Sequence, residues 1–282
     1  MSDGVSRSSL AAIARAEGRL SVSFRVRGGR TVIGRLEQAG CLRARLPRPE
    51  RGALAGAVIM NTAGGIASGD RLATAVVWEA EAAATVSAAA AERVYRARPG
   101  EAAALVRTSL DVGEGGIAEW LPQETILFDA ARLDRTLAVT LADSASFLAV
   151  EALVFGRTAR GEAMRSGLLR DRLEISRGGR LVLADSIRLD GDIAAALARP
   201  AVACGGVAVA SVIRAGPGGE AARDRLRHAL AGLAGAEAGA TFRDGLVVGR
   251  IVARDGASLR RAVLASLAAL RQDRPVPRVW LC

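Results

Sequence analysis

The side chains that hold transition metals most tightly are scarce in this sequence. His228 is the only histidine, and Cys41, Cys204 and Cys282 lie far apart with no C-x-x-C pair. A tight zinc site or a histidine-based metal store needs several nitrogen or sulfur ligands held close together. A Ser-His-Asp triad would depend on His228, which lies in an arginine-rich segment with a helical pattern. We therefore expect no tightly bound cofactor and no histidine-dependent catalysis.

A glycine-rich stretch, NTAGGIASGD at residues 61–70, could be taken for an anion-binding loop. Gly64, Gly65 and Gly69 permit positive φ angles and a close backbone approach. The stretch lacks the Lys-Ser/Thr ending of a P-loop, and its glycine spacing does not fit a dinucleotide fingerprint. Strand-like residues follow it instead of a helix. We interpret it as a structural turn in which Asp70 either binds local backbone N–H groups or faces a cavity.

Paired carboxylates offer a second kind of chemistry. Glu119 and Glu124 flank the segment WLPQ. Two such groups could serve as the acid and the base of a hydrolase of unknown substrate. No nucleophile motif and no cofactor loop accompany them, so we rank this alternative below a non-catalytic function.

The chain of 282 residues has a formal net charge of +10, and all of its basic residues are arginines. This balance suits nucleic acid, an anionic surface or an acidic protein partner. A basic nucleic-acid-binding module is therefore a second alternative function, and it is weakened because only 3% of the residues are aromatic and interleaved stacking aromatics are missing. We find neither a membrane span nor a secretory signal. We expect a cytoplasmic protein that binds neither nucleic acid nor membranes.

The elements that must position these residues are mostly strands. Residues 20–27 alternate apolar and polar side chains, and Gly28-Gly29 then turns the chain into a second strand. The same design returns at residues 173–183 around Gly178-Gly179, and residues 147–155 predict a more fully buried strand. Turn residues separate these segments at short intervals. The pattern favours many short strands over βαβ units.

The last quarter of the chain differs. Apolar residues at helical spacing predict helices at about residues 220–235 and 257–272, with a pair of strands around Asp244-Gly245 between them. We expect residues 19–282 to form a single domain and residues 1–18 to be a flexible tail.

Five segments are distinctive in sequence: GGIASGD (64–70), AERVYR (91–96), EWLPQETI (119–126), FGR followed by GE (155–162) and PRVW (277–280). In this order they resemble the motifs of the UreD (UreH) family of urease accessory proteins, and the similarity runs from about Leu20 to the C-terminus. The residues that carry it are Gly64, Gly65, Gly69, Tyr95, Arg96, Trp120, Pro122, Gln123, Gly156, Arg157, Arg278 and Trp280.

The resemblance implies a non-catalytic urease maturation factor. Such a protein binds UreF and, through UreF, the GTPase UreG, and the assembly docks on apo-urease. Ni²⁺ then moves in transit towards urease, through an internal polar tunnel. The implied fold is mainly β, a β-helical (solenoid-like) body with two helices near the C-terminus.

Transit of Ni²⁺ calls for weak, exchangeable ligands, which carboxylates and water provide. The candidate carboxylates are Asp70, Glu119, Glu124, Glu151, Glu162 and Asp185. Glu151 interrupts an apolar strand, where an acid is costly to bury unless it is paired or faces water. Either it lines a water-filled passage, or it lies on an exposed face or pairs with an arginine such as Arg157 or Arg188. If the passage exists, replacing Glu151 or Asp185 by an apolar residue should lower urease activation and spare complex assembly.

The aromatic residues of the motifs also allow two interpretations. Tyr95, Trp120 and Trp280 are typical of core or edge anchors. Tyr95-Arg96 and Arg278 could instead contact a partner, because aromatic and arginine side chains are favoured at interfaces.

Overall fold

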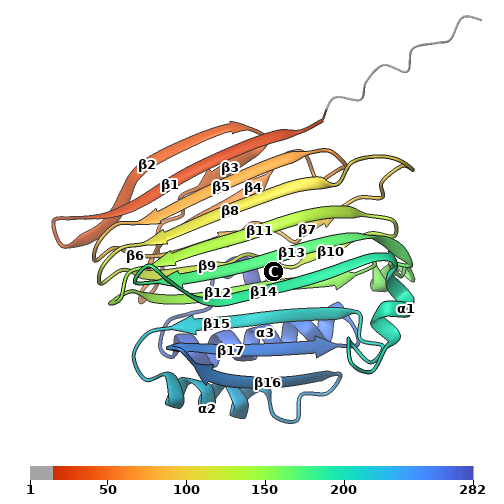
Figure 1. Cartoon of the computed structure of the whole chain (residues 1–282). Coiled ribbons are helices and arrows are strands. Elements are labelled where there is room, and N and C mark those ends of the chain that lie inside the picture. The colour runs from red at the N-terminus through yellow and green to blue at the C-terminus, as the bar shows by residue number, and fades with distance from the viewer. Residues whose placement is uncertain (1–14, 282) are drawn as a thin grey trace, which may run out of the picture.

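Two large β-sheets organise residues 15–281, the part of the chain that the computed structural model describes (Figure 1). The first sheet has the strand order β14 (Arg180–Asp192), β13 (Ser166–Arg177), β11 (Arg132–Leu141), β8 (Ala104–Val112), β5 (Arg71–Trp78), β1 (Glu17–Arg27) and β2 (Arg30–Gly40). Residues 1–14 of the predicted tail (residues 1–18) and Cys282 lie outside the described residues. Within them, β1 begins two residues before the expected boundary at residue 19.

The second sheet has the order β16 (Ala236–Arg243), β17 (Leu246–Ala253), β15 (Ala208–Ala215), β12 (Ser146–Phe155), β9 (Ile117–Leu121), β6 (Ala83–Ala88), β4 (Ala55–Asn61) and β3 (Leu42–Arg45). The short strands β10 (Thr125–Leu127) and β7 (Glu92–Val94) pair beside β12. The prediction of a mainly β protein is confirmed.

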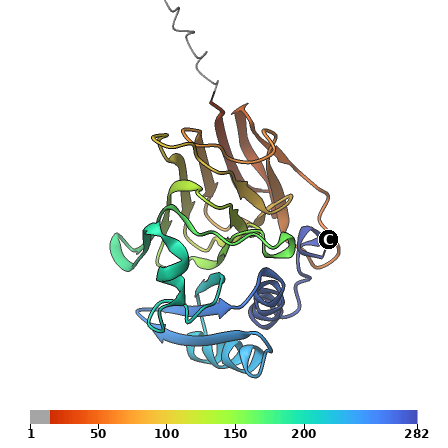
Figure 2. The ribbon, with the colours of Figure 1, turned by 90° about the vertical axis from the view of Figure 1, so that its right-hand side faces the viewer.

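From β5 to β12, the longer strands alternate between the sheets along the chain, while the short strands β7 and β10 stay with the second sheet. After β5 in the first sheet, β6 joins the second, β8 the first, β9 the second, β11 the first and β12 the second. Neighbours formed in this way run parallel in both sheets. The two sheets lie face to face, as the side view shows (Figure 2). The β-helical description stays a prediction.

Antiparallel hairpins close the first sheet on both sides, as the sequence predicted. Gly28 and Gly29, with φ of 58° and 70°, join β1 to β2, and Gly178 and Gly179, with φ of 55° and 76°, join β13 to β14. Two consecutive residues at positive φ are what a type I′ turn requires, and glycine adopts them without steric cost.

The two predicted helices are present as α2 (Gly219–Leu230) and α3 (Gly256–Arg271). α2 ends five residues earlier than expected, because Ala231 adopts an extended conformation. α3 begins where the Asp255 carboxylate accepts a hydrogen bond from the Ser258 N–H at 2.6 Å. α2 packs on β16 and β17, and α3 packs on β15 and β17 (Figure 2).

Three short helical elements were not predicted: α1 (Ile193–Ala198), η1 (Thr158–Arg160) and η2 (Arg278–Trp280). Each has six residues or fewer, too few to create a periodic pattern. None of the helices at residues 15–281 is both long and apolar enough to cross a membrane.

Candidate functional site

A layer of polar side chains interrupts the apolar interior between the two sheets. On four strands, one polar residue stands between buried apolar residues that belong to two different core clusters. On β11, for example, Arg135 separates Leu133 of one cluster from Leu137 of the other. The four residues are Thr74 of β5, Arg135 of β11, Glu151 of β12 and Asp171 of β13. The interior is therefore divided by a polar boundary.

Strand register brings these polar residues together. In the first sheet, Arg135 lies directly beside Asp171. In the second sheet, Glu151 lies beside Ser211, which in turn lies beside Arg250. The polar row Arg135–Asp171 of the first sheet faces the polar row Glu151–Ser211–Arg250 of the second, since residues of both rows line the same cavity.

The Arg135 guanidinium joins the two rows. Its Nη1 lies 2.9 Å from Oε2 of Glu151. Its Nε and Nη2 donate to the two carboxylate oxygens of Asp171 at 2.8 and 2.6 Å. The other oxygen of Glu151 accepts a hydrogen bond from Trp120 Nε1 at 2.8 Å. The side chains of Arg135, Glu151 and Asp171 are only 12–14% exposed, so the triad lies largely out of solvent.

Burial raises the pKa of Glu151. The Arg135 charge opposes this rise, and the nearby Asp171 carboxylate adds to it. The guanidinium is held in its charged form, because Asp171 and Glu151 together outweigh its burial and raise the pKa of Arg135.

Two cavities meet at this triad. One has a volume of about 270 Å³ and extends from Glu151 past Thr125 and Gln123 to Asn61 and Glu92. The other, of about 170 Å³, extends from Glu151 to Asp185 and Arg250. Arg135, Leu137 and Glu151 line both of them. Two charged residues of the triad, Arg135 and Glu151, are thus shared by two cavities between the sheets, whose remaining lining is largely apolar.

Asp185 lies at the far end of the second cavity. Its carboxylate pairs with Arg250 Nη1 at 2.6 Å and is about a quarter exposed. Arg250 also donates to the hydroxyl of Ser211. The expected arginine partners of Glu151 were Arg157 and Arg188, but the observed partner is Arg135. Glu151 and Asp185 thus lie in one connected space, and each is paired.

The remaining predicted carboxylates lie elsewhere and hold the fold together. Glu119 is 1% exposed and pairs with the equally buried Arg271 at 2.8 Å and with Arg274 at 2.9 Å. It also accepts a hydrogen bond from the Thr85 hydroxyl. Burial by itself would raise the pKa of Glu119, but the Arg271 hydrogen bonds and charge lower it overall. Glu119 therefore fixes the end of α3 to the second sheet.

Glu124 and its neighbours fasten the last residues of the chain. Glu124 pairs with Arg260 Nη1 at 3.2 Å, and Arg260 donates to the Trp280 carbonyl at 2.9 Å. The Gln123 amide donates to the Val279 carbonyl at 2.7 Å. Trp280, 1% exposed, donates its indole N–H to the Leu121 carbonyl at 3.1 Å. The EWLPQET and PRVW segments are thus two halves of one contact, and Trp120 and Trp280 are core residues, as predicted.

Asp70 binds backbone N–H groups, one of the two interpretations that the sequence of the glycine loop offered. Its carboxylate accepts hydrogen bonds from the backbone N–H groups of Ala16 at 2.8 Å and Ala67 at 2.7 Å. The Tyr95 hydroxyl donates to the Gly64 carbonyl at 2.6 Å. A Cβ at Gly65 would lie 2.5 Å from the Tyr95 ring, so the ring lies against a backbone that only glycine permits.

Glu162 closes the turn after β12. It accepts from the Asp129 N–H at 2.9 Å and from Arg157 Nε at 2.7 Å. Gly156 is required there, since a Cβ would lie 2.4 Å from the Glu162 carbonyl oxygen. Arg96, although largely exposed, lies 3.3 Å from the Asp129 carboxylate. These motif residues form a local network at one edge of the molecule.

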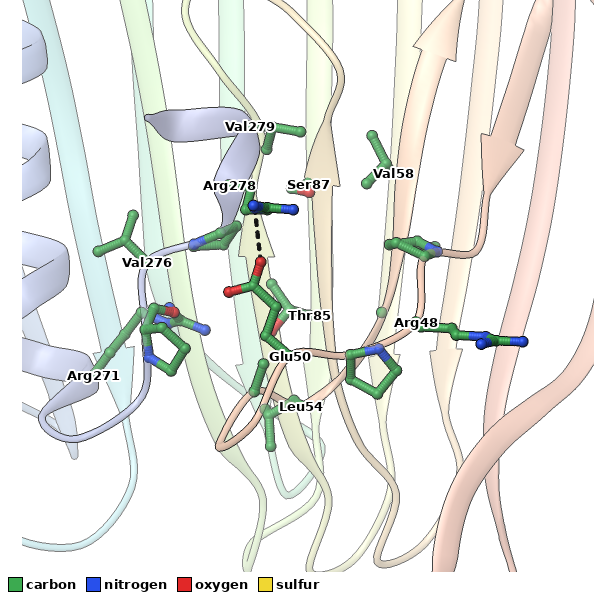
Figure 3. A pocket seen from close by; sticks show the side chains of 17 residues that line it. Arg48, Glu50, Leu54, Val58, Thr85, Ser87, Arg271, Val276, Arg278 and Val279 are labelled. Atoms are coloured by element: carbon green, nitrogen blue, oxygen red, sulfur yellow. Dashed lines mark hydrogen bonds and ion pairs between the residues drawn. The ribbon is translucent and has the colours of Figure 1, made fainter. Parts of the chain in front are cut away.

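Arg278 lies at the mouth of a separate apolar groove of about 260 Å³ (Figure 3). The groove runs between residues 47–54 and residues 275–279, and Arg278 pairs across it with Glu50 at 2.8 Å. Pro122, by contrast, lines the cavity that contains Glu151. Arg278 is 85% exposed, which leaves its predicted role as a partner contact open.

Sequence reasoning missed Arg135, Asp171 and Glu92. Glu92 lines the first cavity, and its burial raises its pKa. The available signal was a charged residue at an inward-facing position of an alternating strand, as at Arg135 between Leu133 and Leu137. Among residues 15–281, no group of three or more His, Cys, Asp or Glu side chains is arranged to hold a metal ion.

The chain was compared with known proteins. The profile of the family described as UreD urease accessory protein matches residues 16–281. A protein of Rhodopseudomonas palustris named urease accessory protein UreD is 47% identical over 267 residues, which cover 95% of this chain and 94% of that protein. Proteins of the same name from Bradyrhizobium diazoefficiens and a Methylobacterium species are 47% and 46% identical, and the matches cover 94–95% of each chain.

Proposed function

We propose, from the premise that the chain belongs to the UreD family of urease accessory proteins, that it is a non-catalytic scaffold for nickel insertion into urease. In this proposal it binds UreF and, through UreF, UreG, and the assembly docks on apo-urease in the cytoplasm. Ni²⁺ is the cargo, and it moves along a path made up of the two cavities between the sheets. The observation that carries the proposal is that two largely buried charged residues, Arg135 and Glu151, line both cavities between the sheets.

The chemistry of the path suits transit better than storage. Its acidic residues are Glu92, Glu151, Asp171 and Asp185, which offer oxygen ligands only. Ni²⁺ is held tightly by nitrogen and sulfur ligands, and carboxylates with water bind it weakly and exchangeably. Glu151, Asp171 and Asp185 are each already paired with an arginine, which further weakens their affinity for a cation.

We propose as well that the alternating parallel strands are turns of a β-helical body. Each passage from the first sheet to the second, such as β8 to β9 or β11 to β12, would then be part of one turn. The path would lie inside this winding, lined by inward-facing residues of successive turns. The other predicted carboxylates, Asp70, Glu119, Glu124 and Glu162, support the walls through the bonds described above.

Replacing Glu151 by Gln, or Asp185 by Asn, tests the path. Each change removes one carboxylate charge with little change in shape. We expect lower nickel content and lower activity of urease co-expressed with UreF, UreG and the variant, with normal co-purification of the complex. Glu174→Gln and Asp190→Asn are matched controls at exposed positions of β13 and β14. Normal urease activation by both path variants would refute the assignment of these residues.

The scaffold role itself is tested by deletion and co-purification. A tagged chain should retain UreF and apo-urease from the same source, and cells without the chain should accumulate apo-urease. Urease that matures normally without the chain, together with a tagged chain that binds neither protein, would overturn the proposed function.

A further inference from the structure

An arginine that lines both cavities of the proposed cation path is unexpected, because its charge repels the cargo. Arg135 is one of three residues that line both cavities, and its side chain is 13% exposed. The positive charge of Arg135 cannot be removed by deprotonation, since guanidinium groups stay charged in proteins. Any Ni²⁺ that crosses the junction must therefore pass this charge.

The guanidinium lies between two largely buried carboxylates, Glu151 and Asp171. Its Nη1 lies 2.9 Å from the Glu151 carboxylate, and it binds both oxygens of Asp171 at 2.6–2.8 Å. Without it, the two largely buried carboxylates would lose their arginine partner, because the other arginines that line this cavity, Arg172 and Arg250, pair with Asp134 and Asp185. Two like charges in such a position attract a divalent cation strongly, because burial lowers the effective dielectric constant.

We propose that Arg135 keeps the passing cation mobile: it competes with Ni²⁺ for Glu151 and Asp171, so that the cation crosses the junction without being retained. This inference rests on the proposed role of the path. Ni²⁺ displaces the guanidinium from one carboxylate while the other still binds it, and the return of Arg135 releases the cation. The charge of Arg135 thus weakens Ni²⁺ binding at the junction and prevents the path from retaining the cation.

The test is retention of Ni²⁺ by the purified full chain with Arg135→Gln, measured by equilibrium dialysis against nickel chloride. We expect this variant to retain Ni²⁺ about tenfold or more tightly than the wild type. Adding Glu151→Gln or Asp171→Asn to Arg135→Gln should return retention to the wild-type level. Arg135→Lys, which keeps the charge, should retain no more than the wild type. Arg107→Gln is a control, since the Arg107 side chain is 43% exposed and its partner Asp134 keeps a second arginine, Arg172.

Retention by Arg135→Gln no stronger than that of the wild type overturns the inference. If Arg135→Gln does not fold without metal, its thermal unfolding with nickel chloride decides. Ni²⁺ should then raise its Tm, and should leave the Tm of the Arg135→Gln/Glu151→Gln double variant unchanged. A Tm of Arg135→Gln that does not respond to Ni²⁺ likewise overturns the inference.

The same variants separate this inference from the proposed function. In cells, Arg135→Gln should lower urease activation with normal co-purification of partners, and Arg135→Lys should restore it. If Glu151→Gln lowers activation but Arg135→Gln retains no Ni²⁺, only the role of Arg135 is refuted. If urease activation by both Glu151→Gln and Asp185→Asn is normal, the path itself is refuted.

Discussion

Replacing Glu119 by Leu should cost more stability than almost any other single change in the second sheet. Glu119 and Arg271 are each 1% exposed and lie 2.8 Å apart. Removing the carboxylate leaves the Arg271 charge buried without its counter-ion. Breaking a buried pair in this way costs about 3–5 kcal/mol. For a chain of this size that corresponds to a Tm lower by roughly 6–20 °C.

A double variant separates the charge effect from the loss of packing. Glu119→Leu combined with Arg271→Met replaces both charges by apolar groups, and we expect it to recover most of the lost stability. Arg274, which is 33% exposed, can turn to solvent and needs no replacement. Glu37→Leu is the surface control, because its pair with Arg35 is exposed and is worth about 0–1 kcal/mol. Thermal unfolding of the four proteins is the assay.

A loss below about 1 kcal/mol in Glu119→Leu would refute this reasoning, as would a double variant no more stable than the single one. The pH dependence gives an independent check. The folded-state pKa of Glu119 lies below its ordinary value of about 4.3, so the unfolded chain takes up the proton first. The stabilisation is therefore complete above about pH 4.3 and disappears as the pH falls through the folded pKa. The Tm difference between wild type and Glu119→Leu should shrink in that acidic range only.

Three further changes test the supporting contacts by thermal unfolding. Gly65→Ala should cost about 1–3 kcal/mol through backbone strain and the clash with Tyr95. The loss should clearly exceed that of Gly64→Ala, whose Cβ would meet nothing within 4 Å. Equal losses in the two variants would contradict the packing argument. Asp255→Ala should cost about 1 kcal/mol by removing the N-cap of α3, while Asp255→Asn keeps most of the stability. Trp280→Ala should cost about 3–5 kcal/mol, and Trp280→Phe much less; similar losses in both would mean that the indole N–H, not the packing, dominates.

The sequence by itself determined the family and most of the local structure. Paired glycines specify the hairpins, since only a residue without Cβ adopts the required φ angles freely. Apolar spacing identifies α2 and α3, although the exact end of α2 depends on a local cap. The motif segments are recognisable one by one because each keeps its own short pattern of residue types.

Only the tertiary structure decided which carboxylates share a space. Glu119 and Arg271 are 152 residues apart in the chain, and Glu151 meets Arg135 and Asp171 through strand pairing and sheet packing. A periodic pattern tells which side of a strand faces inwards, but not which strand will lie opposite. For this reason the sequence could single out Glu151 and Asp185 among the six predicted acids, but it could not identify their partners. Register and the packing of the two sheets assigned four of them to structural bonds elsewhere. Glu151 and Asp185 instead line one cavity between the sheets, each paired with an arginine.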